Sequence, residues 1–298
     1  MAAPAATRLL AIAGGDEPAL AHAKLDALRC FVLLYGAARS WLWLAFNRDL
    51  DPAALAASAV ALTLCAGLTT WPRAATWAPR LALPVLVVQL AWTFPLTNNH
   101  FFLELVCVGL LALVGPDRVG ERVALDALCW VTALVLLHGG LSKVLYGLYF
   151  RGEFLAFMVG RTERFADVFR WLLPVDDVAR LAGYDPLRAG DGPFRVASLP
   201  FVLAANLVYL LEITLAVLLL PRRTRTIAAA CALVLVLVIQ LGARELGFAI
   251  LFGNLLLAFL PRSAPRLLLP VLALLFAWEI AAAFGWLPGR DWVMATNP

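Results

Sequence analysis

Residues 131–146 read VTALVLLHGGLSKVLY, an apolar stretch that carries one lysine, Lys143, near its end. The chain has only two lysines against 22 arginines, so a lysine in this setting stands out from the composition. An amine in hydrocarbon must extend to the interface, find a partner or lose its proton. In the last case it becomes a base. The stretch therefore predicts a membrane-spanning helix and a candidate centre for proton chemistry.

The whole chain is similarly apolar. Its 298 residues are 63% hydrophobic and 15% charged, and the mean hydropathy is +0.86. Soluble domains do not require so much apolar surface, so the composition predicts a polytopic membrane protein. Long unbroken apolar runs favour helices over a barrel, because each helix satisfies its own backbone polar groups in lipid.

The apolar runs predict an all-α bundle of about nine transmembrane helices, with eight as the alternative count. Each run has about 20 residues, the length that a hydrocarbon layer of about 30 Å requires. The runs cover residues 25–46, 52–71, 79–97, 100–116, 123–148, 197–220, 225–242, 245–261 and 267–286. They predict a transmembrane domain over 25–286, with a cytoplasmic or interfacial segment at 1–24 and a tail at 287–298.

Arginines predict the orientation of this bundle. With the N-terminus in the cytoplasm, every inner loop carries at least two arginines and no short outer loop carries more than one. Because basic loops stay inside, we expect a cytoplasmic N-terminus and a periplasmic C-terminus in a bacterial inner membrane. The same loops explain the net charge of +4, so no nucleic-acid partner is expected.

Residues 151–195 interrupt the bundle between the fifth and sixth spans. The segment holds seven arginines and seven acidic residues, and part of it is amphipathic. Amphipathic helices of this kind lie at membrane interfaces. We therefore expect one or two helices on the outer membrane surface.

Polar residues of four predicted helices reach one depth in the outer half of the membrane. Lys143 lies five residues before the predicted end of its helix, or about 7 Å below the interface at 1.5 Å per residue. His100, Gln240 and Glu245 lie at the outer ends of their own segments. Lys143 is thus either a base or a snorkelling residue. His100 is either a hydrogen-bonding partner of a bound ring or a water-facing helix start, capped by Asn98 or Asn99.

Two glycines and several charged residues complete the candidate set. Gly139 and Gly140 permit close approach of another helix or of a flat ligand. Glu212 lies deep in the sixth span, Glu279 in the ninth, and Arg29 and Arg39 in the first. We interpret these charges as internal ion pairs or protonated carboxyls, with an ion path as the competing hypothesis. The five cysteines form no CxxC pair, so neither disulfides nor a metal site is expected.

Three stretches together resemble the membrane domain of vitamin K-dependent gamma-carboxylases, the horizontally transferred transmembrane (HTTM) domain. They follow the family's order over residues 25–262. The stretches are NNHFFL at 98–103, GGLSK at 139–143, and LLEIT at 210–214 followed by RELGF at 244–248.

The resemblance implies a quinol of the vitamin K or menaquinol type as cofactor, and no metal. Lys143 matches the family's base, which deprotonates the quinol before its oxygenation to an epoxide; proton abstraction from a glutamate and carboxylation are coupled to that step. His100 would be the quinol's hydrogen-bonding partner. The implied binding residues are Asn99, Gly139, Gly140, Gln240, Glu245 and Glu212.

The chain departs from the family in three respects. Ser142 replaces the first lysine of a pair, and Gln240 replaces a histidine. The family's large lumenal domain has no counterpart in the sequence, so a partner protein would have to supply it. We expect a quinol-dependent enzyme of the carboxylase or epoxidase type, a lyase. The alternatives are a non-catalytic membrane subunit that holds a quinone, lipid or pigment, and an ion-coupled transporter.

Overall fold

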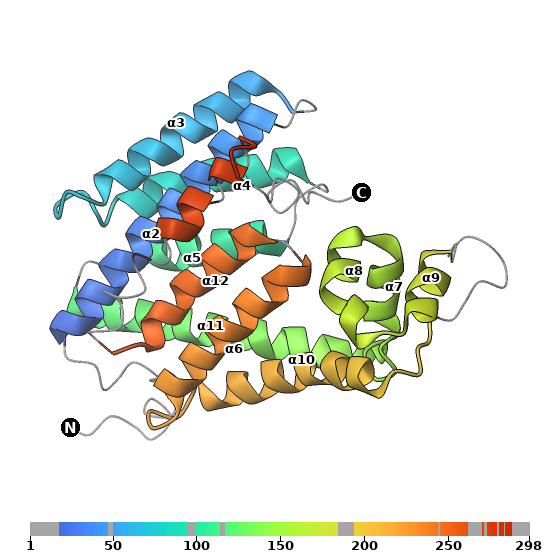
Figure 1. The fold of residues 1–298 in the computed structure, drawn as a ribbon. Helices are drawn as coiled ribbons and strands as arrows, with labels where there is room; N and C mark the ends of the chain where they lie inside the picture. Colours follow the sequence, from blue (N-terminus) through green and yellow to red (C-terminus); the bar gives the residue numbers. More distant parts are fainter. Residues whose placement is uncertain are drawn as a thin grey trace. The chain divides into compact units, whose positions relative to one another are not determined.

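The computed structural model describes residues 18–46, 50–94, 99–113, 117–183, 194–243, 245–261, 270, 273–278, 280–282 and 284–287. Within these ranges the chain forms helices and no strand, which confirms the all-α prediction for this part of the molecule (Figure 1). The chain divides into two compact units. Unit 1 comprises Met1–Thr132 with Glu245–Pro298, and unit 2 comprises Ala133–Arg244.

Unit 1 is built around the long first helix, α2. Its elements are α2 (Pro18–Phe46), α3 (Pro52–Leu68), α4 (Ala78–Thr93), α5 (Asn99–Leu113), the first half of α6 (Arg118–Tyr146), α12 (Leu246–Leu256) and the 3-10 turn η2 (Leu257–Phe259). Helix α3 packs along α2, and α2 also contacts α5 and α12 (Figure 1). The side chain of Asp51 caps α3 by accepting a hydrogen bond from Ala53 N at 3.0 Å, and Pro52 occupies the first position of the helix.

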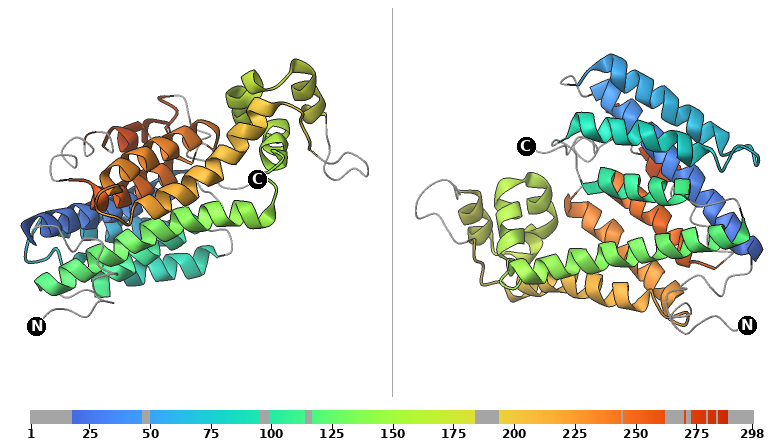
Figure 2. Two further views of the ribbon diagram at one scale, coloured as in Figure 1. Left: turned by 90° about the horizontal axis from the view of Figure 1, so that it is seen from below. Right: turned by 180° about the vertical axis from the view of Figure 1, so that it is seen from behind.

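Unit 2 contains the second half of α6 and all helices up to α11. Its further elements are α7 (Glu153–Arg161), α8 (Glu163–Phe169), the 3-10 turn η1 (Arg170–Leu172), α9 (Val175–Ala182), α10 (Leu199–Leu218) and α11 (Arg225–Ala243). Helices α6 and α10 lie side by side in both views of Figure 2. Gly147 and Gly152, with φ of 69° and 72°, form the turn that leads from α6 to α7.

The segment between α6 and α10 differs from the sequence-based expectation. It folds into three short α-helices and one 3-10 turn rather than one or two helices. Their apolar side chains form a shared core with the start of α10, which consists of Leu155, Ala156, Val159, Phe165, Leu173, Leu181, Phe201 and Ala205. Gly160 allows this packing, because a Cβ there would lie 2.5 Å from the carbonyl oxygen of Leu181 on α9. Much of the amphipathic pattern thus reflects packing of helix on helix.

The first eight predicted spans each coincide with a helix. Two of the described helices, Val119–Tyr146 and Leu199–Leu218, are long and apolar enough to cross a membrane. The other apolar helices have 10–17 residues, and 17 residues of α-helix extend only about 25 Å. The two long helices make the fold compatible with a membrane protein, whereas the shorter ones do not reach across the hydrocarbon layer by themselves. Of the predicted ninth span, 267–286, only part lies within the described residues.

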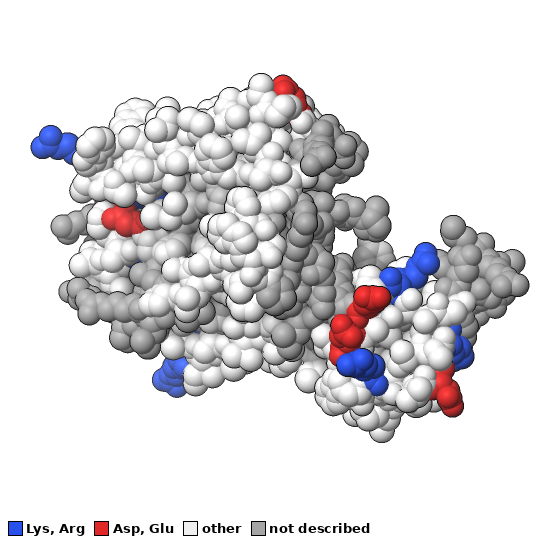
Figure 3. Space-filling view, turned by 45° about the horizontal axis from the view of Figure 1, so that its top comes forward, with Lys and Arg blue, Asp and Glu red and all other residues white. Residues whose placement is uncertain are grey.

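Charged side chains are unevenly distributed over the surface. On the face drawn in Figure 3, few of them lie over the helices of unit 1, and most gather over the lobe formed by α7, α8 and α9. Large apolar side chains are exposed on helices of both units, including Leu64, Val88 and Leu113 in unit 1 and Leu203 and Val234 in unit 2. Water disfavours exposed apolar side chains in such numbers, whereas lipid accommodates them.

Candidate functional site

Lys143 lies in the last turn of α6 and is paired with Glu212 of α10. Its Nζ donates hydrogen bonds to both carboxylate oxygens of Glu212, at 2.9 and 2.8 Å, and to the carbonyl oxygen of Gly139 at 3.2 Å. The two side chains are only 20% and 10% exposed. An ammonium group has three N–H donors, so these three acceptors use all of them.

The Lys143–Glu212 pair decides between the three alternatives for a lysine in an apolar stretch. The amine neither extends freely to the interface nor stands isolated as an uncharged base; it has a partner. The N–O distances of 2.9 and 2.8 Å are those of a close lysine–glutamate pair. Glu212 is thus part of an internal ion pair. This is the interpretation that we favoured for a charge deep inside an apolar run.

The neighbouring glycines bring α6 against α10. A Cβ at Gly140 would lie 2.6 Å from Cγ1 of Ile213 and 3.0 Å from the carbonyl oxygen of Tyr209. A Cβ at Gly139 would lie 3.5 Å from Glu212 Oε2, which is an ordinary contact. Two uses were expected of these glycines, close approach of a helix and close approach of a flat ligand. At Gly140 the structure shows the first of them.

Aromatic and amide side chains surround the pair within unit 2. Lys143 Nζ lies 5.6 Å from the ring centroid of Tyr149, which stacks on Phe154 at 5.1 Å. Burial raises the pKa of the Tyr149 phenol, and the nearby negative charge of Glu212 raises it further. Asn206 donates to the carbonyl oxygen of Phe150 at 3.1 Å, and the hydroxyl of Tyr209 donates to Asn206 Oδ1 at 2.7 Å. This network ties the turn after α6 to α10.

The other predicted site residues divide between the two units. In unit 1, His100 Nε2 lies 3.3 Å from Glu245 Oε2, and the His100 ring packs on Phe248 with centroids 5.0 Å apart. Asn99 is exposed at the start of α5. In unit 2, Gln240 is buried, and neither polar atom of its amide has a hydrogen-bond partner among the described residues.

A second buried ion pair lies in unit 1, where the sequence predicted an internal ion pair for Arg39 but did not identify its partner, Glu104. Arg39 Nε donates to Glu104 Oε2 at 2.9 Å, and Arg39 Nη2 donates to Gln89 Oε1 at 3.0 Å. The guanidinium also lies over the rings of Trp43 and Phe101, at 4.5 and 4.2 Å from their centroids. Glu104 is a lone acid inside the apolar run 100–116, and that signal would have identified it. Glu279 lies outside the described residues.

No family model, curated protein or solved structure matches this chain at a significant level. The resemblance to the HTTM domain therefore stands on the three sequence stretches alone. Within the part of the chain that the structure describes, no group of three or more His, Cys, Asp or Glu residues could hold a metal ion. The side chains gathered at the site are an amine, a carboxylate, phenols and an amide.

Proposed function

We propose that this chain is an HTTM-type integral membrane protein of about nine spans that binds a quinol in unit 2, beside the Lys143–Glu212 pair. The single observation that carries the proposal is that pair, an ammonium and a carboxylate in direct contact and mostly shielded from solvent. Ionisable groups within apolar helices are costly, and they mark functional sites in membrane proteins by default. The exposed apolar side chains of α3, α4 and α5 support placement in lipid.

The pair has the chemistry for moving a proton. Because Lys143 Nζ directs its hydrogen bonds at Glu212 and Gly139, we assign the Glu212 carboxylate as the group that accepts a proton from a bound hydroxyl. The Lys143 ammonium then stabilises the negative charge that the transfer leaves on the oxygen of the bound hydroxyl. This division of roles differs from the family's, in which the lysine is the base.

The buried amide of Gln240 is compatible with a polar ligand. It offers one donor and one acceptor that no described residue satisfies, and a quinol hydroxyl can satisfy both. A bound quinol would supply reducing equivalents and an acidic hydroxyl. The resemblance extends the proposal to quinol epoxidation coupled to carboxylation, with an extracytoplasmic partner protein that presents the substrate, in a bacterial inner membrane.

A second candidate function is a non-catalytic membrane subunit that holds a quinone, lipid or pigment. One observation favours it: all three N–H donors of Lys143 are satisfied inside the protein. A saturated ammonium is typical of a residue that fixes helix register. The transporter hypothesis has no such support, because Arg39 is held by Glu104, Gln89 and two rings.

The test is quinol binding and quinol oxidation by the purified protein in liposomes. Menaquinol binding would be followed by quenching of intrinsic tryptophan fluorescence, and oxygen-dependent oxidation by absorbance. We expect wild type to bind and oxidise menaquinol, and Glu212→Gln to bind it with at least tenfold slower oxidation. Binding without oxidation by wild type supports the subunit function, and absence of binding refutes the proposal.

Two further variants separate chemistry from folding. Ser142→Ala is the matched control, because Ser142 is adjacent to Lys143 and its hydroxyl donates only to the Gly139 carbonyl in the described contacts. The double variant Lys143→Ala/Glu212→Ala removes both charges together, so it leaves no unpaired buried ion. If the double variant is stable and still oxidises menaquinol at the wild-type rate, the pair has no catalytic part.

A further inference from the structure

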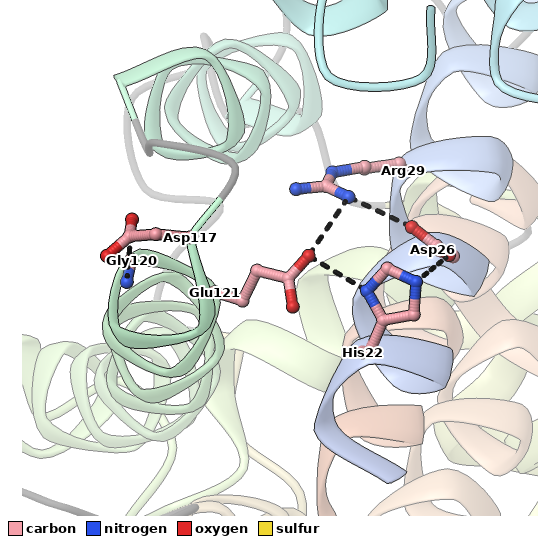
Figure 4. A network of polar contacts seen from close by, with 6 residues as sticks. All are labelled: His22, Asp26, Arg29, Asp117, Gly120 and Glu121. Carbon is pink, nitrogen blue, oxygen red and sulfur yellow. Dashed lines mark hydrogen bonds and ion pairs between the residues drawn. The ribbon is translucent and has the colours of Figure 1, made fainter. Parts of the chain in front are cut away.

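Four charged side chains form a closed ring between α2 and the first turns of α6, all within unit 1 (Figure 4). His22 Nδ1 lies 2.8 Å from Glu121 Oε1, and His22 Nε2 lies 3.1 Å from Asp26 Oδ2. Arg29 Nη1 lies 2.9 Å from Asp26 Oδ1 and 3.9 Å from Glu121 Oε1. Cations and anions alternate around this charge ring.

The charge ring closes fully only when His22 carries both ring protons. A neutral imidazole has one N–H donor and one acceptor nitrogen, whereas imidazolium has two donors. Both nitrogens of His22 face carboxylate oxygens, so loss of one proton sets a nitrogen lone pair against an oxygen. It also changes the summed charge of the four groups from zero to −1.

Burial makes the ring sensitive to this change. Arg29 and Glu121 have side chains that are only 2% and 9% exposed, so their charges are poorly screened by solvent. His22 is 57% exposed and can therefore exchange its proton with the aqueous phase. The ring thus combines a solvent-accessible titrating group with two buried charges that depend on it.

We propose that the charge ring of His22, Asp26, Arg29 and Glu121 is a pH-sensitive clamp that holds α2 to the start of α6. It is closed while His22 carries both ring protons, and it loosens when one of them is lost. The sign follows from the contacts: the protonated imidazole gains partners on folding, so the stabilisation is present at the acidic end and lost towards the alkaline end.

Other charged groups nearby have assignments of their own. On α2, Lys24 Nζ is buried and donates to the carbonyl oxygen of Ala258 in η2. At the start of α6, Asp117 accepts a hydrogen bond from Gly120 N at 3.3 Å and so caps the helix (Figure 4). Asp26 and Glu121 are thus the carboxylates that face the imidazole, and Arg29 is the cation that faces both of them.

The first experiment measures thermal unfolding of the detergent-solubilised full chain from pH 5.5 to 8.5. We expect the wild-type midpoint to fall with pH, by at least about 2 °C. His22→Gln should lose most of this dependence, because glutamine does not titrate. Glu121→Gln should lose it too, because an amide at position 121 can pair with a neutral imidazole. The matched control is His138→Gln, since His138 is exposed on α6; it should follow wild type. Equal pH dependence in wild type and His22→Gln would overturn the proposal.

The second experiment observes the imidazole directly and does not depend on stability. The chain has three histidines, so ring nitrogen NMR signals of ¹⁵N-histidine-labelled protein are few, and His22→Gln assigns the signal of interest. The closed charge ring requires both nitrogens of His22 to be protonated, and Asp26→Asn/Glu121→Gln removes the carboxylates that accept their hydrogen bonds. An unprotonated nitrogen on His22 at pH 6 would refute the clamp.

Discussion

Gly140 lies where α6 packs directly against the backbone of α10, and its missing side chain makes that approach possible. A Cβ there would meet backbone atoms of α10 at 3.0 and 3.1 Å, and backbone cannot rotate away as a side chain can. Overpacking of this kind costs about 1–3 kcal/mol. We therefore expect Gly140→Ala to lower the free energy of unfolding by that amount, as measured by SDS titration of the protein in mixed micelles.

Gly139 provides the matched control for this substitution. It occupies the same helix one residue earlier, but a Cβ there would make only ordinary contacts with the Glu212 carboxylate. Alanine gains about 1 kcal/mol over glycine in helix propensity. Gly139→Ala should thus be neutral or stabilising. Equal destabilisation by both substitutions would show that α10 does not pack against Gly140.

Tyr149 gives a prediction in alkaline solution. Its pKa is raised in the folded protein by burial and by Glu212, so the folded state favours the neutral phenol. This contribution is fully present below about pH 10, where a free tyrosine is neutral, and it is lost as pH rises further because the unfolded chain ionises. Between pH 9 and 11 the thermal unfolding midpoint of Tyr149→Phe should therefore fall less than that of wild type. The exposed Tyr146→Phe serves as control and should track wild type.

At the scale of residues, the sequence identified which groups are unusual better than it identified their partners. Lys143 and Glu212 both stand out as charges inside apolar runs, and the structure joins them. They are 69 positions apart, however, and the pairing depends on how α6 and α10 are rotated about their axes. The charge ring was predicted only in part: Arg29 stands out inside the first span, whereas His22, Asp26 and Glu121 lie near the ends of predicted spans, where charges are ordinary.

At the scale of elements, Arg39 and Glu104 connect three helices of unit 1. Arg39 on α2 reaches Glu104 on α5 and Gln89 on α4, and Gln89 donates onward to Ser40 at 3.1 Å. Gly36 leaves room for this carboxylate, since a Cβ at that position would force Glu104 Oε1 to shift. Removing one partner of such a buried pair leaves an uncompensated charge, whereas removing both does not.

A double-mutant cycle tests this connection. Arg39→Met alone should lower the free energy of unfolding by about 3–5 kcal/mol, because Glu104 is left buried without its cation. Arg39→Met/Glu104→Leu should recover most of that loss. The measurement is again SDS titration, with Arg73→Met as control because Arg73 is exposed in the turn after α3. Costs that simply add in the double variant would show that the two side chains do not interact.

Helix positions were largely predictable because long apolar runs and caps are local signals. Helix α11, predicted at 225–242, forms at Arg225–Ala243, and Asp51 with Pro52 starts α3 where the sequence indicates. The role of the α7–α9 segment was not predictable in this way. An amphipathic helix has the same pattern whether its apolar face meets lipid or another helix, and here Phe165 and Leu181 meet other helices.

At the scale of the whole molecule, helix length and loop charge indicate different numbers of membrane crossings. Among the described helices, α6 and α10 are the two that are long and apolar enough to cross a membrane. The arginine pattern nevertheless alternates across all nine apolar runs, and the shorter helices are flanked by turns that can extend into the interfacial layers, which add about 10–15 Å to the hydrocarbon thickness. Two crossings and nine crossings therefore place specific loops on opposite sides of the membrane.

Reporter fusions at two positions distinguish these topologies. With nine crossings, the loop at 95–98 and the C-terminus both lie outside; with only α6 and α10 crossing, both lie inside with the N-terminus. We expect an alkaline phosphatase reporter to be active at both positions and a green fluorescent protein reporter to be dark there. The turn at 221–224 is the internal control, since both topologies place it inside. Fluorescence at 95–98 would reduce the bundle to its two long helices, and fluorescence at the C-terminus alone would favour eight spans, because an even number of crossings returns the chain to the side on which it began.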